Sequence, residues 1–146
     1  MKHLHYLLTI MDNKEVKLTK TYTFSASHRL HSPFIGEKEN AAIYGKCGRT
    51  SGHGHNYRLK ITIKGVVNSK TGVAGDINKL DDMVNKVIIS PLDHKNLNME
   101  IKDVPILTSE VLINEVWKRL KSSDQVPEIC GIELEETEKN SFQFFG

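Results

Sequence analysis

Three histidines stand at positions that suit a metal site. His53 and His55 are two residues apart in a stretch that alternates like a strand, so their imidazoles point to one face. His28 ends an earlier alternating stretch, on the face that carries Phe24. If the two strands pair, three ring nitrogens meet and leave a fourth position open, the pattern of catalytic zinc rather than of a closed structural site. These residues therefore predict a bound Zn²⁺, whereas a plain surface or loop role is preferred for His3, His5 and His31.

Two further groups are candidates for proton transfer beside that metal. Cys47 lies in a glycine-rich loop with Lys46 and Arg49 nearby. Positive charge favours the thiolate form of a cysteine, so this position is typical of a reactive thiol. The alternative is a structural or zinc-bound cysteine. Asp93 directly precedes His94, and a neighbouring carboxylate can orient an imidazole and raise its basicity.

Glu136 is a candidate for binding a ligand. It alternates with Ile132 and Leu134, so all three point to the same face of a predicted strand. A carboxylate that faces a core must find hydrogen-bond donors. A flat ligand with two N–H groups would supply them in bidentate fashion. The alternative is a glutamate at a strand end that turns to solvent.

The elements that must position these residues begin and end with strands. Alternation predicts a strand over 15–28, in which Lys20 is the polar exception on the apolar face. A second strand is expected from 53 to 63. Two more strands are expected over 130–136 and 142–144, with a turn at Lys139-Asn140.

Helices are expected between these two pairs of strands. Apolar residues follow helical spacing over about 78–90, and Pro91 ends that helix. A second helix begins near Thr108 and Ser109, where a hydroxyl can cap its first turn. The long polar stretch 29–54 is interpreted as a functional or mobile loop. This order predicts an α+β domain with an antiparallel four-stranded sheet and two helices packed on one face.

Length, composition and net charge indicate the number of domains and the classes of partner. With 146 residues, 38% hydrophobic residues and a formal net charge of +2, it suits one soluble domain with no nucleic-acid or membrane partner. We expect that domain over 15–146, after a flexible N-terminal extension over 1–14 in which Met11 is a second possible start. The only two cysteines are Cys47 and Cys130. We interpret Cys130 as a packing residue, and the chain as reduced and cytoplasmic.

Five motifs, taken together, resemble one known family. They are FSASHRL at 24–30, YGKC at 44–47, GHGHNY at 52–57, LDHKNL at 92–97 and ETE at 136–138. In this order they are similar to the 6-pyruvoyl tetrahydropterin synthase family, and the resemblance runs from about Thr21 to the C-terminus. It implies the tunnelling fold, in which subunits assemble into a barrel as a hexamer of two stacked trimers with active sites between subunits.

The resemblance also implies roles for individual residues. His28, His53 and His55 match the zinc ligands, and Glu136 matches the residue that anchors the pterin. Cys47 matches the catalytic base, and Asp93 with His94 matches its assisting pair, which could come from another subunit. A further match places Thr108 and Ser109 at the border of the pterin.

The reaction implied by this family is a lyase reaction of tetrahydrobiopterin biosynthesis. It converts 7,8-dihydroneopterin triphosphate to 6-pyruvoyl-tetrahydropterin, with loss of triphosphate and no external redox cofactor. The related 6-carboxytetrahydropterin synthase of queuosine biosynthesis is the alternative. Five residues separate Cys47 from His53, which favours the pyruvoyl enzyme, whereas CGR at 47–49 and LTSEV at 107–111 are more like the relative.

Two rival functions differ in the residues they need. A non-catalytic metal or pterin carrier would keep the histidines but would not need Cys47, Asp93 or His94. A pterin aldolase or epimerase of the same fold would use no zinc. The sequence contains both the metal-site histidines and the proton-transfer residues Cys47, Asp93 and His94, which favours the zinc enzyme. The identity of the product stays open at this point.

Overall fold

The computed structural model describes residues 14–123 and 127–146. His3, His5, Met11 and nearly all of the expected N-terminal extension lie outside these residues. Four long strands form an antiparallel meander across the sheet, as the sequence predicts. They are β1 (Glu15–His28), β2 (His53–Val66), β4 (Glu128–Thr137) and β5 (Asn140–Phe144). The turn between the last two is Glu138-Lys139, one residue earlier than expected.

A fifth strand makes the sheet mixed, so the prediction of four antiparallel strands is wrong in this respect. The strand β3 (Lys95–Asn96) pairs parallel with β1, opposite Ala26 and Ser27. The full order is β3-β1-β2-β4-β5. Two residues are too few to show an alternating pattern, so this strand exists only because the tertiary fold brings it to the edge of β1.

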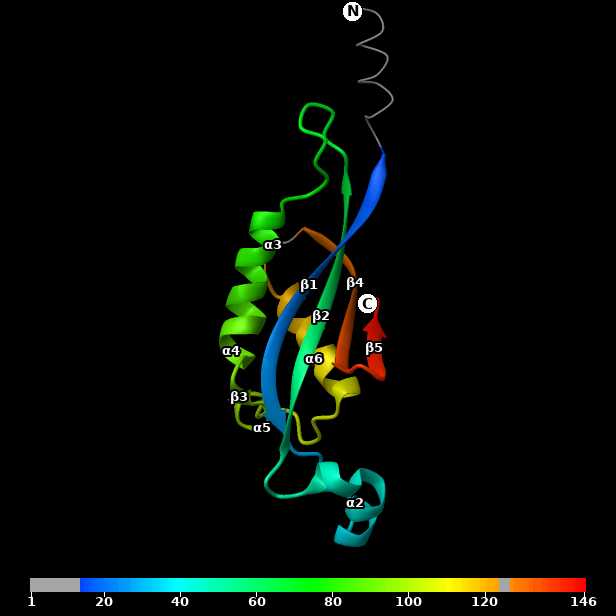
Figure 1. Cartoon of the computed structure of the whole chain (residues 1–146), viewed down its shortest axis with the longest axis vertical. Helices are drawn as coiled ribbons and strands as arrows, with labels where there is room; N and C mark the ends of the chain where they lie inside the picture. The colour runs from blue at the N-terminus through cyan, green and yellow to red at the C-terminus, as the bar shows by residue number, and fades with distance from the viewer. Residues whose placement is uncertain (1–13, 124–126) are drawn as a thin grey trace, which may run out of the picture.

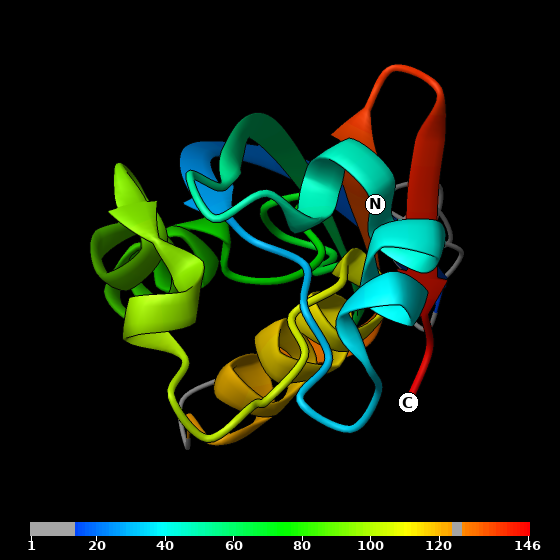
Figure 2. The ribbon, with the colours of Figure 1, turned by 90° about the horizontal axis from the view of Figure 1, so that it is seen from below.

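Two helical segments cover one face of the sheet (Figure 1). The first runs without a break through α3 (Ile77–Val84), the π-helical turn η2 (Asn85–Ile89) and α4 (Ser90–Leu92). It therefore ends one residue after Pro91, close to the expected position. The second is α6 (Ser109–Lys121), which Figure 2 shows to one side of the strands when the molecule is viewed from the α2 end. Thr108 occupies the N-cap position of α6, but its side chain makes no capping hydrogen bond.

The segment 29–54 is not the plain loop that its composition indicates. It contains α2 (Glu37–Tyr44) and the 3₁₀ turn η1 (Gly45–Gly48), which lie beyond the His28 end of the sheet (Figure 1). The short α2 is anchored by one polar side chain rather than by an apolar stripe. Asn40 is buried, accepts a hydrogen bond from the Ser32 backbone at 2.8 Å and donates to the Ser32 carbonyl at 3.0 Å. Such an anchor leaves no helical periodicity in the sequence.

The core lies between the helices and the inward side of the strands. Every odd position of β2 from Tyr57 to Ile63 is at most 1% exposed, and the even positions face outward. Lys20 shares the apolar face of β1 because Asp81 on α3 neutralises it, with 2.6 Å between Nζ and the carboxylate. Tyr22 donates to the same carboxylate at 2.8 Å. Among residues 14–123 and 127–146, no helix has the length and apolar character that crossing a bilayer requires.

Candidate metal centre and surrounding site

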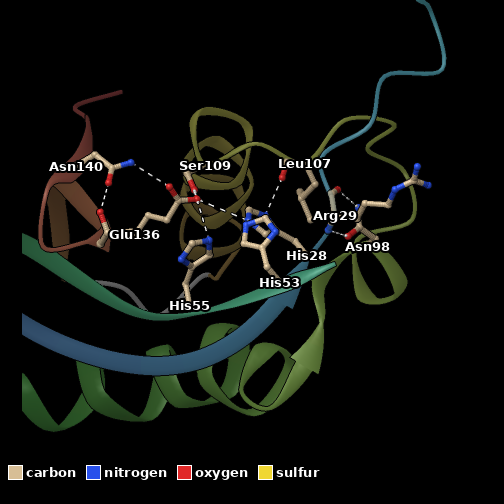
Figure 3. A network of polar contacts seen from close by, with 10 residues as sticks. His28, Arg29, His53, His55, Asn98, Leu107, Ser109, Glu136 and Asn140 are labelled. Carbon is tan, nitrogen blue, oxygen red and sulfur yellow. Dashed lines mark hydrogen bonds and ion pairs between the residues drawn. The ribbon is translucent and has the colours of Figure 1, made fainter. Parts of the chain in front are cut away.

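The sheet register brings His28, His53 and His55 together. His28 is the direct partner of His53 on the neighbouring strand, and Ala26 is the partner of His55. One ring nitrogen from each of the three histidines lies within 4.8 Å of the other two, and 3.1 Å separates the Nε2 atoms of His28 and His53. Figure 3 shows the three imidazoles close to one another, with Glu136 beside them.

The surroundings of His28 keep its imidazole neutral. Burial, together with charge repulsion from His53 and His55, lowers the pKa of His28 from 6.5 to about 4. Nδ1 of His28 lies 3.0 Å from the carbonyl oxygen of Leu107. Because a carbonyl only accepts, Nδ1 must carry the proton, and Nε2 is left with its lone pair facing the other rings. Burial also lowers the pKa of His55.

These three nitrogens fit a divalent metal ion. Nε2 of His55 is buried and has no hydrogen-bond partner within residues 14–123 and 127–146, so a buried lone pair is available. Tetrahedral zinc with bonds of about 2.0–2.1 Å holds its nitrogen ligands roughly 3.3–3.4 Å apart, close to the 3.1 Å between His28 and His53. The hydrogen bond from His28 to Leu107 is the kind of contact that orients a metal-binding imidazole.

Glu136 faces this cluster rather than solvent. Its Oε1 accepts a hydrogen bond from Ser109 Oγ at 2.6 Å, and its Oε2 accepts one from Asn140 Nδ2 at 3.0 Å. Oε1 also lies 3.7 Å from Nε2 of His28 and 3.6 Å from Nε2 of His55. The carboxylate is thus held by two donors (Figure 3), while its remaining lone pairs stay available for a ligand with N–H groups.

Cys47 lies in η1 and is half-buried. The loop around it is attached to the end of β1, since its carbonyl accepts from the Leu30 backbone at 3.0 Å and the next carbonyl, of Gly48, accepts from Arg29 Nε at 2.9 Å. Its sulfur is not part of the compact histidine group among the described residues. The geometry therefore does not support a metal-bound Cys47.

Asp93 and His94 lie beside Ser25, on the edge of β1 that also pairs with β3. Oδ1 of Asp93 accepts from the Ser25 backbone at 2.8 Å, and Oδ2 lies 2.9 Å from Nδ1 of His94. The hydrogen bond from the Ser25 N–H is the main cause that holds the pKa of Asp93 below its ordinary value, and the hydrogen bond with His94 adds to it. The His94 side chain is 82% exposed. Within the described part of the chain, no hydrogen bond or ion pair joins this pair to Cys47.

A cavity of about 820 Å³ is lined by His55, Tyr57, Asp93, His94 and Glu136, together with outward-facing positions of the strands such as Asn56 and Arg58. Its size suits a flat heterocyclic ligand. The sequence pattern did not indicate that Tyr57 lines this cavity, although Tyr57 continues the alternation of His53 and His55. Nor did it indicate that Asn140 donates to Glu136. Of the lone histidines, His31 lies 3.4 Å from Glu37 at the surface, in accord with a plain surface role.

Comparison with known proteins gives matches over most of the chain. A family model described as 6-pyruvoyl tetrahydropterin synthase matches residues 17–146. A Drosophila melanogaster protein named 6-pyruvoyl tetrahydrobiopterin synthase is 38% identical over 88% of this chain and 79% of its own. The solved structure of Caenorhabditis elegans 6-pyruvoyl tetrahydropterin synthase, 33% identical, superposes with a TM-score of 0.86 over 92% of this chain and 98% of its own. A Haemophilus influenzae 6-carboxy-5,6,7,8-tetrahydropterin synthase is 28% identical over 83% of this chain and 92% of its own.

Proposed function

Because the chain belongs to the 6-pyruvoyl tetrahydropterin synthase family, whose activity is that of a lyase, we propose that it converts 7,8-dihydroneopterin triphosphate to 6-pyruvoyl-tetrahydropterin. Triphosphate leaves in this reaction, and the side chain is oxidised internally while the ring is reduced. The observation that carries the proposal is the group of three converging histidines, of which His28 is fully buried, with Glu136 beside it. The metal-binding group and the acceptor for a flat ring thus lie next to each other.

Each residue of the site has a separate role in the proposed reaction. His28, His53 and His55 would hold Zn²⁺, which when bound supplies a Lewis acid that stabilises developing negative charge on substrate oxygen. Glu136 accepts the N–H groups of the pterin edge, and Ser109 with Thr108 borders the ring. Cys47 removes a proton from a side-chain carbon. Asp93 orients His94 for a second proton transfer, and the 2.9 Å contact between them supports this role.

No hydrogen bond or ion pair joins Cys47 to His94 within the described part of the chain, which supports an oligomer in which one active site uses residues of more than one subunit. The proposed assembly is a hexamer of two stacked trimers that forms a barrel. His94 is highly exposed in the single chain, which leaves it accessible to a neighbouring copy. Light scattering of the purified protein measures the assembly directly.

A mixing experiment tests whether sites are shared. Cys47→Ala and His94→Ala homo-oligomers should each be nearly inactive. Reassembled together, they should recover about a quarter of wild-type activity, since random pairing leaves about that share of sites with both residues intact. If mixed oligomers stay as inactive as their parents, shared sites are excluded.

The choice of product is the finer part of the proposal. The five-residue spacing between Cys47 and His53 favours the pyruvoyl product, and the Haemophilus influenzae relative keeps the carboxy product as a second candidate. Mass spectrometry of the products from 7,8-dihydroneopterin triphosphate decides between them. Metal analysis of the purified protein distinguishes these two zinc-dependent synthases from an aldolase or epimerase, which would contain no zinc. Full turnover by Cys47→Ala would contradict the role of Cys47 as the base, whereas a wild-type protein that binds the pterin without turning it over would favour a carrier.

A further inference from the structure

Tyr57 carries a hydroxyl that the fold does not use. The side chain is 0% exposed. Its ring stacks on Phe24, with 5.0 Å between centroids, and meets the edges of His55 at 5.5 Å and His28 at 6.3 Å. The hydroxyl itself has no hydrogen-bond partner among residues 14–123 and 127–146. A buried hydroxyl without a partner destabilises the folded state, so phenylalanine would suit the packing of this position better.

The neighbours of this hydroxyl belong to the proposed pterin site. The register of β2 and β4 pairs Arg58 with Glu135, so the next position along places Tyr57 beside Glu136. Burial raises the pKa of Tyr57, the negative charge of Glu136 raises it further, and the Ser109 hydroxyl lowers it. The 2.6 Å hydrogen bond between Ser109 and Glu136 keeps Ser109 at the carboxylate beside Tyr57, although the phenol hydroxyl has no hydrogen-bond partner among the described residues.

Ser109 is able to link Tyr57 to Glu136. Its hydroxyl already donates to Oε1 of Glu136 at 2.6 Å, and a hydroxyl that donates its proton keeps two lone pairs for accepting. Ser109 is itself buried, with 3% exposure, at the first turn of α6. The link forms when this turn brings Ser109 Oγ within hydrogen-bond distance of the Tyr57 O–H.

We propose that Tyr57 is a positioning residue of the pterin site, whose hydroxyl donates to Ser109 when a pterin is bound and thereby holds Glu136 in place. This inference rests on the proposed function, because it requires a ligand whose N–H groups engage Glu136. When such a ligand arrives, Oε1 must accept from both the ligand and Ser109. A bond from Tyr57 fixes and polarises the Ser109 hydroxyl for that task, since linked hydrogen bonds strengthen one another.

The proposal gives Tyr57→Phe opposite effects on stability and on binding. In the ligand-free protein the variant removes an unpaired buried group, so its urea midpoint should equal or exceed that of the wild type. In the complex it removes a hydrogen bond, so the Kd for 7,8-dihydroneopterin should rise about tenfold. A hydroxyl that only supports the fold would instead lower the midpoint and leave the Kd unchanged.

Tyr22→Phe is a matched control on the same face of the sheet. The Tyr22 hydroxyl donates to Asp81 at 2.8 Å, outside the proposed site. Its removal should lower the urea midpoint and leave the Kd for 7,8-dihydroneopterin as it is in the wild type. The two Tyr→Phe variants should therefore show opposite patterns of stability and affinity.

A double-variant measurement tests whether Tyr57 acts through Ser109. With zinc-loaded protein and pterin fluorescence as the readout, Tyr57→Phe should weaken binding in the wild type but cause no further loss in Ser109→Ala. Equal loss in both backgrounds, or no loss in the wild type, overturns the inference and leaves the proposed function standing. If the zinc-loaded wild type itself binds no 7,8-dihydroneopterin, the proposed function and this inference fall together.

Discussion

The burial of His28 predicts a specific pH dependence of stability in the metal-free protein. The pKa of His28 falls from 6.5 to about 4 on folding, so between these values the unfolded chain binds more protons than the folded one. Stability must therefore decrease as the pH is lowered from about 7 towards 4, and this contribution levels off below the folded pKa. The folded state disfavours the protonated ring because it is buried among two other imidazoles, and Glu136 offsets this only in part.

The size of the effect follows from the same pair of values. The whole decrease in pKa corresponds to roughly 3 kcal/mol of unfolding free energy at low pH. About 2 kcal/mol of it should be lost between about pH 7 and about pH 5, where the unfolded histidine takes up its proton. His55, whose pKa is also lowered by burial, adds to the loss in the same direction.

A comparison with His28→Asn isolates the contribution of His28. The amide nitrogen of asparagine occupies nearly the place of Nδ1 and can still donate to the Leu107 carbonyl, but it does not titrate. Urea unfolding of chelator-treated protein at the two pH values should show a loss about 2 kcal/mol larger for the wild type than for the variant. Equal losses in the two proteins would refute the reasoning that burial keeps His28 neutral.

Further predictions concern the metal, the ligand anchor, the Lys20 contact and the core. Loading with Zn²⁺ should raise the thermal midpoint of the wild type but not of His55→Ala, as followed by calorimetry, because the metal binds only the assembled site. Glu136→Gln should raise KM for the pterin about 10-fold or more with a smaller change in kcat, as steady-state kinetics would show. Asp81→Asn leaves the partly exposed Lys20 without its counter-ion and should cost about 1 kcal/mol in urea unfolding. Leu134→Ala empties a fully buried position and should cost about 2–5 kcal/mol, while zinc content per folded chain stays unchanged.

The strands and their buried faces follow closely from the sequence pattern. The alternation over 15–28 predicted β1 to the residue, because side chains of a strand point to opposite faces in turn and only one face meets the core. The same rule placed His53 and His55 on one side. Polar positions broke the rule only where a tertiary partner compensated, as Asp81 does for Lys20.

Short elements and pairings between distant segments were not visible in this way. The strand β3 has two residues, and α2 is anchored by Asn40 rather than by an apolar stripe. Neither leaves a periodic pattern, because the contacts that stabilise them are single hydrogen bonds or come from another part of the chain.

The sequence by itself determined which residue types are available for chemistry and which face of each strand carries them, since both depend on local order along the chain. Only the tertiary structure decided that His28 and His53 lie opposite each other, that Ser109 donates to Glu136, and that Asp93 lies beside Ser25 of β1. These relations depend on register, on how a helix end meets a strand, and on loop paths, which are set by packing between segments far apart in the sequence.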